Sequence, residues 1–234
     1  MNNQFQRTEI LIGTENLNKL KKQTIAIFGI GGVGSYVTEA LARAGIGKFI
    51  LIDKDKIDIT NINRQIPALH STVGRYKVEV MKERLLDINP DLNIKAIKKL
   101  YNAETSDEIL TEDYDYVVDA IDMVTSKIKL IETCKEKGFN IISSMGMGNK
   151  LDPTKIVVTD IYKTHTCPLA KVLRRELKDR RIKKLKVVYS TEQPRELQER
   201  IMNGRKVTPG SISFVPSVGG LTIASVVVRE LLER

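Results

Sequence analysis

The sequence predicts an α/β protein with a mostly parallel sheet, helices on both faces, and a C-terminal extension of further strands and helices. Short apolar runs alternate with segments of helical period, which is typical of βαβ units. A glycine-rich turn directly follows the first apolar run. Asn89-Pro90 and Gly138 end two of the helical segments, as turn residues do.

The first part of the chain alternates regularly between the two patterns. Apolar, β-branched runs predict strands at 24–28, 48–52, 92–97, 116–118 and 139–143. Helices are expected at 33–44, 74–87, 107–110 and 126–137, and a polar loop at 53–73.

The second part is less regular. It predicts strands at 155–162, 185–190 and 212–215, and helices at 168–181 and 221–232. Two prolines and two glycines in 193–210 indicate a mobile loop.

Composition and cysteine content limit the class of protein. The chain has 234 residues, 41% of them hydrophobic, which is enough for a large core. Its longest apolar run, 218–228, is shorter than the ~18 residues of a membrane span. Cys134 and Cys167 are too few for a secreted disulfide scaffold, and the N-terminus is polar. We therefore expect a cytoplasmic protein without a membrane span.

Positive charge is concentrated in one segment. The net charge is +9, and residues 163–186 contain ten Lys or Arg against Glu176 and Asp179. Such a run forms either a surface for a polyanion or a solvated helix face. Charge alone favours the solvated face.

The glycine-rich turn has the spacing of a nucleotide-binding loop in a Rossmann-like fold. Its GxGxxG glycines are Gly29, Gly31, Gly32 and Gly34. Glycines at a helix N-terminus let backbone N–H groups approach phosphates. Asp53 follows Gly34 by 19 residues and ends a strand, where a carboxylate can bind ribose. A glycine turn of structural use only is the alternative, and the loop does not distinguish a dinucleotide from ATP.

Charged and polar residues beyond Asp53 favour ATP. Adenylation needs cations that neutralise the phosphates and a carboxylate that can hold Mg²⁺, whereas hydride transfer needs neither. Singly, these side chains would be surface charges or helix caps. The candidates are Asp55, Asn61, Arg64, Gln65, Lys77 and Asp122.

Taken together, these motifs resemble the ubiquitin-activating (E1-like) superfamily of adenylating enzymes, over about residues 7–150. The resemblance implies that residues 1–150 form an ATP-binding adenylation region in which Asp53 binds ribose. It further implies that Asp122 binds Mg²⁺ and that Arg7 reaches ATP on the partner subunit of a homodimer. The phosphate-binding residues implied are Asn61, Arg64, Gln65 and Lys77.

The C-terminal part narrows the branch of that superfamily. Branches that activate sulfur carriers hold zinc with two Cys-x-x-Cys pairs, and this chain has none. Residues 168–177, 186–194 and 210–216 resemble the tRNA threonylcarbamoyladenosine dehydratase branch. That resemblance implies ATP-dependent cyclisation of N6-threonylcarbamoyladenosine at position 37 of tRNA through an acyl-adenylate, with residues 151–234 as a tRNA-binding extension. The implied tRNA-binding residues are Lys171, Arg174, Arg175, Lys178, Arg180 and Arg181.

One residue departs from the pattern of this branch. Cys167 stands where the resemblance implies an acidic residue before Pro168. It is either a small loop residue or a reactive thiol. Two alternatives stay open: adenylation of a carrier-protein C-terminus, with sulfur passed through Cys167 from a sulfur-relay protein, and an NAD-binding oxidoreductase or redox sensor.

Overall fold

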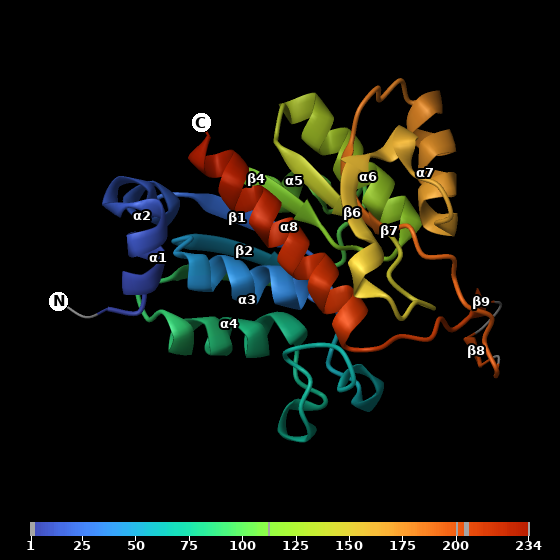
Figure 1. Ribbon diagram of the computed structural model, residues 1–234, viewed down its shortest axis with the longest axis horizontal. Coiled ribbons are helices and arrows are strands. Elements are labelled where there is room, and N and C mark those ends of the chain that lie inside the picture. Colours follow the sequence, from blue (N-terminus) through green and yellow to red (C-terminus); the bar gives the residue numbers. More distant parts are fainter. Residues whose placement is uncertain (1–2, 112, 200, 204–205, 234) are drawn as a thin grey trace.

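A central sheet organises the chain, with strand order β3-β2-β1-β4-β5-β7-β6 (Figure 1). The structure is a computed structural model that describes residues 3–111, 113–199, 201–203 and 206–233. Six of these strands are parallel, and β6 (Ile156–Asp160) pairs antiparallel with β7 at one edge. The parallel strands are β1 (Thr24–Phe28), β2 (Lys48–Ile52), β3 (Asn93–Ile97), β4 (Tyr116–Asp119), β5 (Ile141–Ser144) and β7 (Lys186–Ser190).

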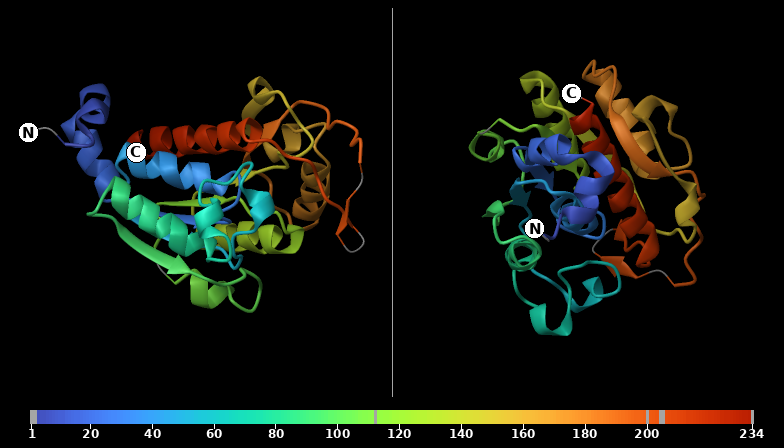
Figure 2. Two further views of the ribbon diagram at one scale, coloured as in Figure 1. Left: turned by 90° about the horizontal axis from the view of Figure 1, so that it is seen from below. Right: turned by 60° about the vertical axis from the view of Figure 1, so that its left-hand side comes forward.

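Helices cover both faces of the sheet, as predicted (Figure 2). One apolar cluster joins a first face to α3 (Gly34–Ala44), α4 (Lys77–Ile88) and α8 (Phe214–Leu232). A second cluster joins the opposite face to α5 (Ser106–Ile109), α6 (Val124–Lys137) and α7 (Pro168–Asp179). The inner strands β1, β2, β4, β5 and β7 are buried on both faces, which explains why apolar residues dominate their sequences, whereas the edge strands β3 and β6 are partly exposed.

Two N-terminal helices were not predicted. They are α1 (Gln6–Ile12) and α2 (Thr14–Lys21), and they lie at the C-terminal end of α3. Gly45 ends α3 with a φ of 104°, and a Cβ there would lie 2.7 Å from Leu17 Cδ1. The two short helices therefore close the end of α3 that lies away from the glycine-rich turn.

The predicted strand at 212–215 is wrong, because α8 already begins at Phe214, seven residues before the predicted helix start. Pro216 lies in the first turn of α8, where a missing N–H costs no helical hydrogen bond. Gly220 lies at a close approach of helices, since a Cβ there would be 2.5 Å from the O atom of Val33, the N-cap residue of α3. Proline and glycine thus serve the packing of one continuous helix here.

The helix α8 is also long and apolar enough to cross a membrane by length and composition. In the structure 56% of its apolar window is buried, and it packs against α3 and the sheet. This burial is that of a core helix.

The C-terminal part adds to the same sheet. The proposed boundary at residue 150 falls after β5, and both β6 and β7 lie beyond it. Most of 193–210 has no regular structure, apart from the projecting hairpin of β8 (Met202–Asn203) and β9 (Lys206–Val207) (Figure 1). Residues 200, 204 and 205 of the predicted mobile loop lie outside the described residues.

Candidate active site

A cavity of about 350 Å³ opens at the carboxyl ends of β1, β2, β4 and β5. Ligands of open α/β sheets bind at this edge, where the strand order reverses direction. The structure brings nine of the predicted residues to its walls: Gly29, Gly31, Gly32, Asp53, Asp55, Arg64, Gln65, Lys77 and Asp122.

The glycine-rich turn forms the floor of this cavity. Gly29 has a φ of 88°, and a Cβ there would lie 2.6 Å from Ala120 O. Gly34, behind the lining residues, packs so closely that its Cβ would lie 1.8 Å from Gly29 O. Because α3 begins at Gly34, its N-terminal dipole points toward the turn. The turn therefore offers a narrow cradle suited to phosphate groups.

Asp53 ties the end of β2 to the glycine-rich turn. Its Oδ2 accepts a hydrogen bond from the Ile30 N–H at 2.7 Å, and its Oδ1 accepts one from the Asp55 N–H at 2.8 Å. Burial raises the pKa of this carboxyl group, and the nearby Lys77 opposes that rise. The group is held in place by backbone donors at the edge of the cavity.

Lys77 brings a buried positive charge to the same wall. Its side chain is 8% exposed, and Nζ lies 3.1 Å from Asp55 Oδ2. The Lys77 N–H also donates to Asp55 O at 3.1 Å, which fixes the start of α4 against the segment after β2. The ammonium group is thus positioned by the fold before any ligand binds.

Arg64 and Gln65 follow the 3-10 helix η1 (Ile59–Asn61). The Arg64 guanidinium donates through Nη1 to Thr60 O at 2.9 Å and to Asn63 Oδ1 at 2.8 Å. Gln65 is 8% exposed, and its Oε1 accepts no hydrogen bond from the described residues. A buried carbonyl without a donor is costly, so this atom favours a ligand that donates a hydrogen bond.

Besides Gly34, two residues predicted for this site, Asn61 and Arg7, do not line the cavity. Asn61 uses its side chain locally, because its Oδ1 accepts from the Asp58 N–H at 3.2 Å to cap η1. Arg7 is exposed on α1, beyond the far end of α3. The 11 residues of α3 span about 16 Å, so Arg7 cannot reach the glycine-rich turn of its own chain.

Comparison with known proteins assigns this chain to a family. The sequence profile of the ThiF family matches residues 4–233. The chain belongs to the ThiF family. It is similar to the tRNA threonylcarbamoyladenosine dehydratase of Bacillus subtilis, with 46% identity over 244 residues that cover 100% of this chain and 96% of that protein.

Solved structures resemble this ThiF-family chain over nearly its whole length. The crystal structure of Escherichia coli tRNA N6-threonylcarbamoyladenosine dehydratase, TcdA, in complex with ATP superposes with a TM-score of 0.91 at 34% identity. Its complex with AMP gives the same TM-score at 35% identity. Each comparison covers 98% of this chain and 94% of the other.

Several cavity residues of this ThiF-family chain were not predicted from the sequence. A second glycine-containing segment, from Met145 to Gly148, follows β5 and also lines the cavity. Asn149, with a φ of 59°, anchors the segment at 209–211: it donates its N–H to Gly210 O at 2.8 Å, and its Oδ1 accepts from the Gly210 N–H at 2.7 Å. Glycines directly after a buried strand were the available signal. Asp119, which was not among the predicted site residues, pairs with the buried Lys127.

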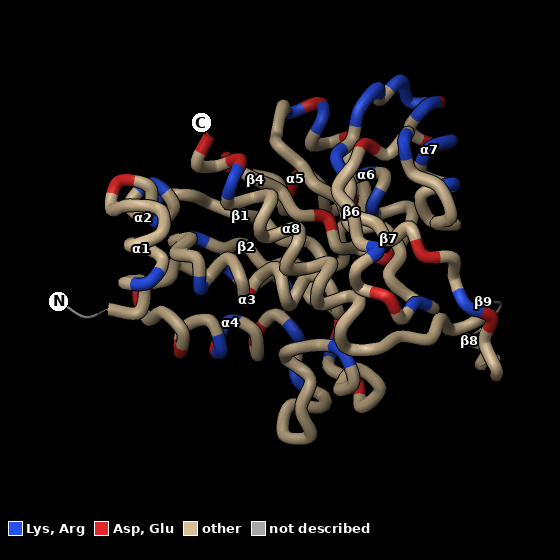
Figure 3. Tube along the Cα trace, in the orientation of Figure 1, with Lys and Arg blue, Asp and Glu red and all other residues tan. Residues whose placement is uncertain are grey.

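The basic segment forms α7 and the turn after it (Figure 3). Some of its cations have intramolecular partners: Arg174 Nη1 donates to Thr164 O at 2.9 Å, and Arg180 Nε lies 2.7 Å from Glu132 Oε1. Lys171 and Lys178 are exposed and make no ion pair with the described residues. They are seven residues apart, so they share one face of α7 and lie about 10 Å apart.

Proposed function

We propose that this protein uses ATP to cyclise N6-threonylcarbamoyladenosine at position 37 of tRNA, through an acyl-adenylate, giving the cyclic hydantoin. The observation that carries the proposal is the convergence of the glycine-rich turn, Asp53, Lys77 and Asp122 on one cavity. Its likeness to dehydratases over nearly its full length supports the same reaction. A tRNA substrate is consistent with a cytoplasmic location.

The cavity has groups suited to each part of ATP. The glycine-rich turn and the N-terminus of α3 would hold phosphates, and Asp53 would bind the ribose hydroxyls. Arg64 and Lys77 would neutralise the charge that develops on the α-phosphate and on the leaving pyrophosphate. Gln65 Oε1 would accept a hydrogen bond from the nucleotide or the substrate.

The residues present fit a magnesium ion held jointly with phosphates. Asp122 is an exposed carboxylate on the cavity wall, and the described residues contain no group of three or more potential metal ligands. Mg²⁺ typically takes one or two protein carboxylates and completes its shell with phosphates and water. Asp122 would hold it, and a bound Mg²⁺ would neutralise charge on the phosphates.

The chemistry needs two displacements. The threonyl carboxylate attacks the α-phosphate, and pyrophosphate leaves. A nitrogen of the same substituent, losing its proton, then attacks the activated carbonyl, and AMP departs with the former carboxylate oxygen. Water is therefore lost formally, and ring closure is intramolecular, which places the nucleophile next to its target.

A cysteine nucleophile is not required by this scheme. Cys167 is 3% exposed and does not line the cavity. The backbone of Gly146 lies between the Cys167 thiol and the cavity, because Gly146 lines the cavity and a Cβ on it would be 3.6 Å from Cys167 Sγ. The buried position of Cys167 disfavours the alternative in which a sulfur-relay protein exchanges sulfur with this thiol.

A homodimer would complete the site with Arg7. This residue shares one face of α1 with Ile10 and Leu11, which are three and four residues further along the helix. Ile10 is 74% exposed and Leu11 is 84% exposed. A second copy that covers these apolar side chains would bring Arg7 toward the ATP phosphates of its partner.

Mass spectrometry of tRNA nucleosides tests the proposed function. A tRNA that carries uncyclised threonylcarbamoyladenosine is incubated with the protein, ATP and Mg²⁺. A parallel reaction omits ATP. We expect a nucleoside lighter by one water, formed only with ATP, together with AMP and pyrophosphate. If a carrier protein instead of tRNA triggers AMP formation, the carrier-protein alternative is correct.

A further inference from the structure

A fully buried ion pair lies directly behind one wall of the cavity. Lys127 Nζ is 2.7 Å from Asp119 Oδ2, and both side chains are 0% exposed. Ser143 Oγ donates to the same Asp119 oxygen at 2.5 Å and accepts from Lys127 Nζ at 3.1 Å. The three side chains form a closed network that no step of the proposed chemistry uses.

This network joins three elements at the carboxyl edge of the sheet. Asp119 ends β4 and lies in register beside Phe28 on one side and Ser143 of β5 on the other. Lys127 lies in the first turns of α6 and donates its N–H to Met123 O at 3.0 Å. The network therefore fixes the start of α6 relative to the strand ends that surround the site.

The second oxygen of Asp119 reaches the cavity wall. Asp119 Oδ1 accepts a hydrogen bond from the Ile121 N–H at 3.1 Å. Ala120 donates its N–H to Phe28 O at 2.8 Å, and its carbonyl packs against Gly29 so closely that no side chain would fit there. The turn at 120–122 is thus held between the buried network and the glycine-rich turn, and this turn carries Asp122.

Stability does not explain a charged network at this place. The desolvation cost of a buried ion pair is commonly as large as its Coulombic gain, so apolar residues of similar volume serve the fold as well. What a closed network adds is a single fixed geometry. We infer that Lys127 and Ser143 are positioning residues of the adenylation site, acting through Asp119 and the Ile121 N–H on the turn that presents Asp122. The inference rests on the proposed function.

The test compares Lys127→Met and Ser143→Ala with the wild type. We expect kcat of Lys127→Met to fall about 10–100-fold, because small misplacements of a reacting group cost this much. The ATP dissociation constant should change by less than about threefold, since the glycine-rich turn, Arg64 and Lys77 are untouched. Ser143→Ala should give a smaller loss of the same kind. Hydrogen exchange of the Ile121 amide should accelerate in both variants.

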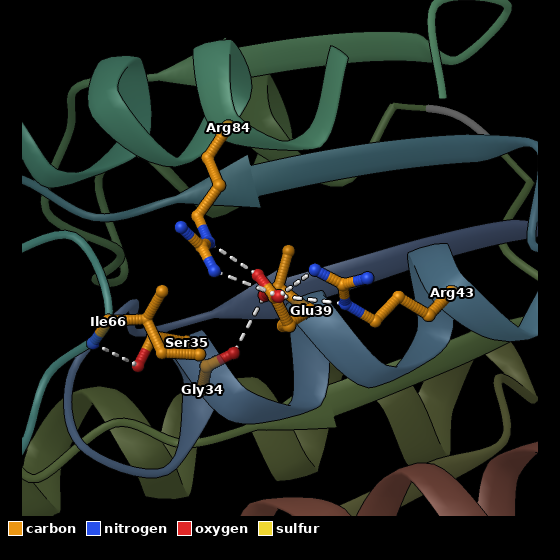
Figure 4. A network of polar contacts seen from close by, with 7 residues as sticks. Gly34, Ser35, Glu39, Arg43, Ile66 and Arg84 are labelled. Carbon is orange, nitrogen blue, oxygen red and sulfur yellow. Dashed lines mark hydrogen bonds and ion pairs between the residues drawn. The ribbon is translucent and has the colours of Figure 1, made fainter. Parts of the chain in front are cut away.

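Arg84→Met is the matched control. Arg84 binds Glu39 and joins α4 to α3 (Figure 4), and neither residue lines the cavity. If Arg84→Met lowers kcat as much as Lys127→Met, the loss reflects general destabilisation and the inference is overturned. A folded Lys127→Met protein with wild-type kcat, or with unchanged Ile121 exchange, also overturns it.

Two cases need further variants or measurements: a Lys127→Met protein that does not fold, and a wild type that does not form the cyclic nucleoside. Lys127→Met leaves the Asp119 carboxylate buried and unpaired, which can prevent folding. In that case the charge-neutral double variant Lys127→Met/Asp119→Asn and the Ser143→Ala variant decide the inference. If the wild type itself forms no cyclic nucleoside, the proposed function fails. Ile121 exchange and ATP affinity in the same variants then decide whether the network positions the turn.

Discussion

Asp53 and Gln65 line the same cavity but differ in what holds their side chains. Asp53 accepts two backbone hydrogen bonds, whereas Gln65 Oε1 has no donor among the described residues. Asp53 follows a strand in a known motif, so the sequence predicted its place. The pairing of Lys127 with Asp119 could not be predicted, because a lysine in an amphipathic helix usually faces solvent. Only the fold shows that Lys127 is 0% exposed.

The charges of Asp122 and Arg64 should be needed for catalysis. Asp122→Asn and Arg64→Ala should each slow pyrophosphate release on the order of 10²–10³-fold, because each removes a preorganised charge near the phosphates. Release is measured with tRNA substrate and saturating ATP. Asp113→Asn is the control, since Asp113 is exposed and precedes β4 at the opposite end of the sheet. Near-normal release in a folded Asp122→Asn protein would contradict the assignment.

Neither cysteine should take part in the reaction. Both thiols are buried, and burial raises the pKa of Cys134 to about 12. A protonated, inaccessible thiol is a poor nucleophile. We expect Cys167→Ser to keep cyclisation activity, and the native wild type to react with an aromatic disulfide reagent only after denaturation. A folded but inactive Cys167→Ser protein would instead support a sulfur-relay step.

Among the elements, β1 and β2 have the predicted bounds, and most others differ by one to three residues. The apolar runs of β1 and β2 are long enough to form strands, and glycine or polar residues bound them on both sides, so both ends could be predicted. The start of α8 was missed because Pro216 and the pair Gly219-Gly220 are unfavourable residues for a helix, whereas in the fold Gly220 allows close contact with the start of α3. The N-terminal helices were missed because α1 has no buried residue of its own and α2 buries only Leu17 and Leu20.

The stability that the contact between α3 and α4 contributes should depend on pH. Glu39 is partly desolvated, which opposes its ionisation, but hydrogen bonds from Arg84 and Arg43 outweigh this and lower its pKa below 4.5. A carboxyl group with a lowered pKa contributes stability above its unfolded-state pKa and loses it as the pH falls through the folded-state value.

Arg84→Met should therefore lower the free energy of unfolding by about 0.5–1 kcal/mol near neutral pH, since Arg84 is half-exposed and solvent screens the pair. The difference from wild type should shrink once the pH falls below 4.5, the ordinary pKa of Glu39. Urea unfolding of both proteins across this range measures it. A difference that stays constant with pH would mean that lost packing of the Arg84 stem, not its charge, is responsible.

For the whole molecule, the proposed homodimer predicts a site that Arg7 shares between two copies. Arg7→Ala and Lys77→Ala homodimers should each be inactive, because every site lacks one group. After subunit exchange, one of the two sites in each heterodimer has both groups, so part of the activity should return. Pyrophosphate release from a purified heterodimer with two different affinity tags measures this. Absence of recovery in that heterodimer would show that Arg7 does not act on the partner.

The exposed lysines of α7 should bind tRNA phosphates. Affinity falls with salt by roughly 0.7–0.9 logarithmic units for each phosphate contact. Lys171→Gln/Lys178→Gln should therefore weaken binding and flatten the salt dependence by about 1.5 units if both touch phosphates. Lys21→Gln/Lys22→Gln, two exposed lysines at the end of α2, is the matched control. Equal slopes for both double variants would show that α7 is a solvated face.

The place of β7 between β5 and β6 affects how the chain folds during synthesis. The ribosome releases β1 to β5 in an order that lets each strand join a neighbour already made. The edge strand β6 emerges next, but its sheet neighbour β7 begins 26 residues later, after α7. Until then the nascent chain carries Val157 and Val158 on a strand with free backbone donors and acceptors, which is the kind of edge that other chains can pair with. We therefore expect the nascent chain to depend most on chaperones after β6 has emerged from the ribosome and before β7 has emerged.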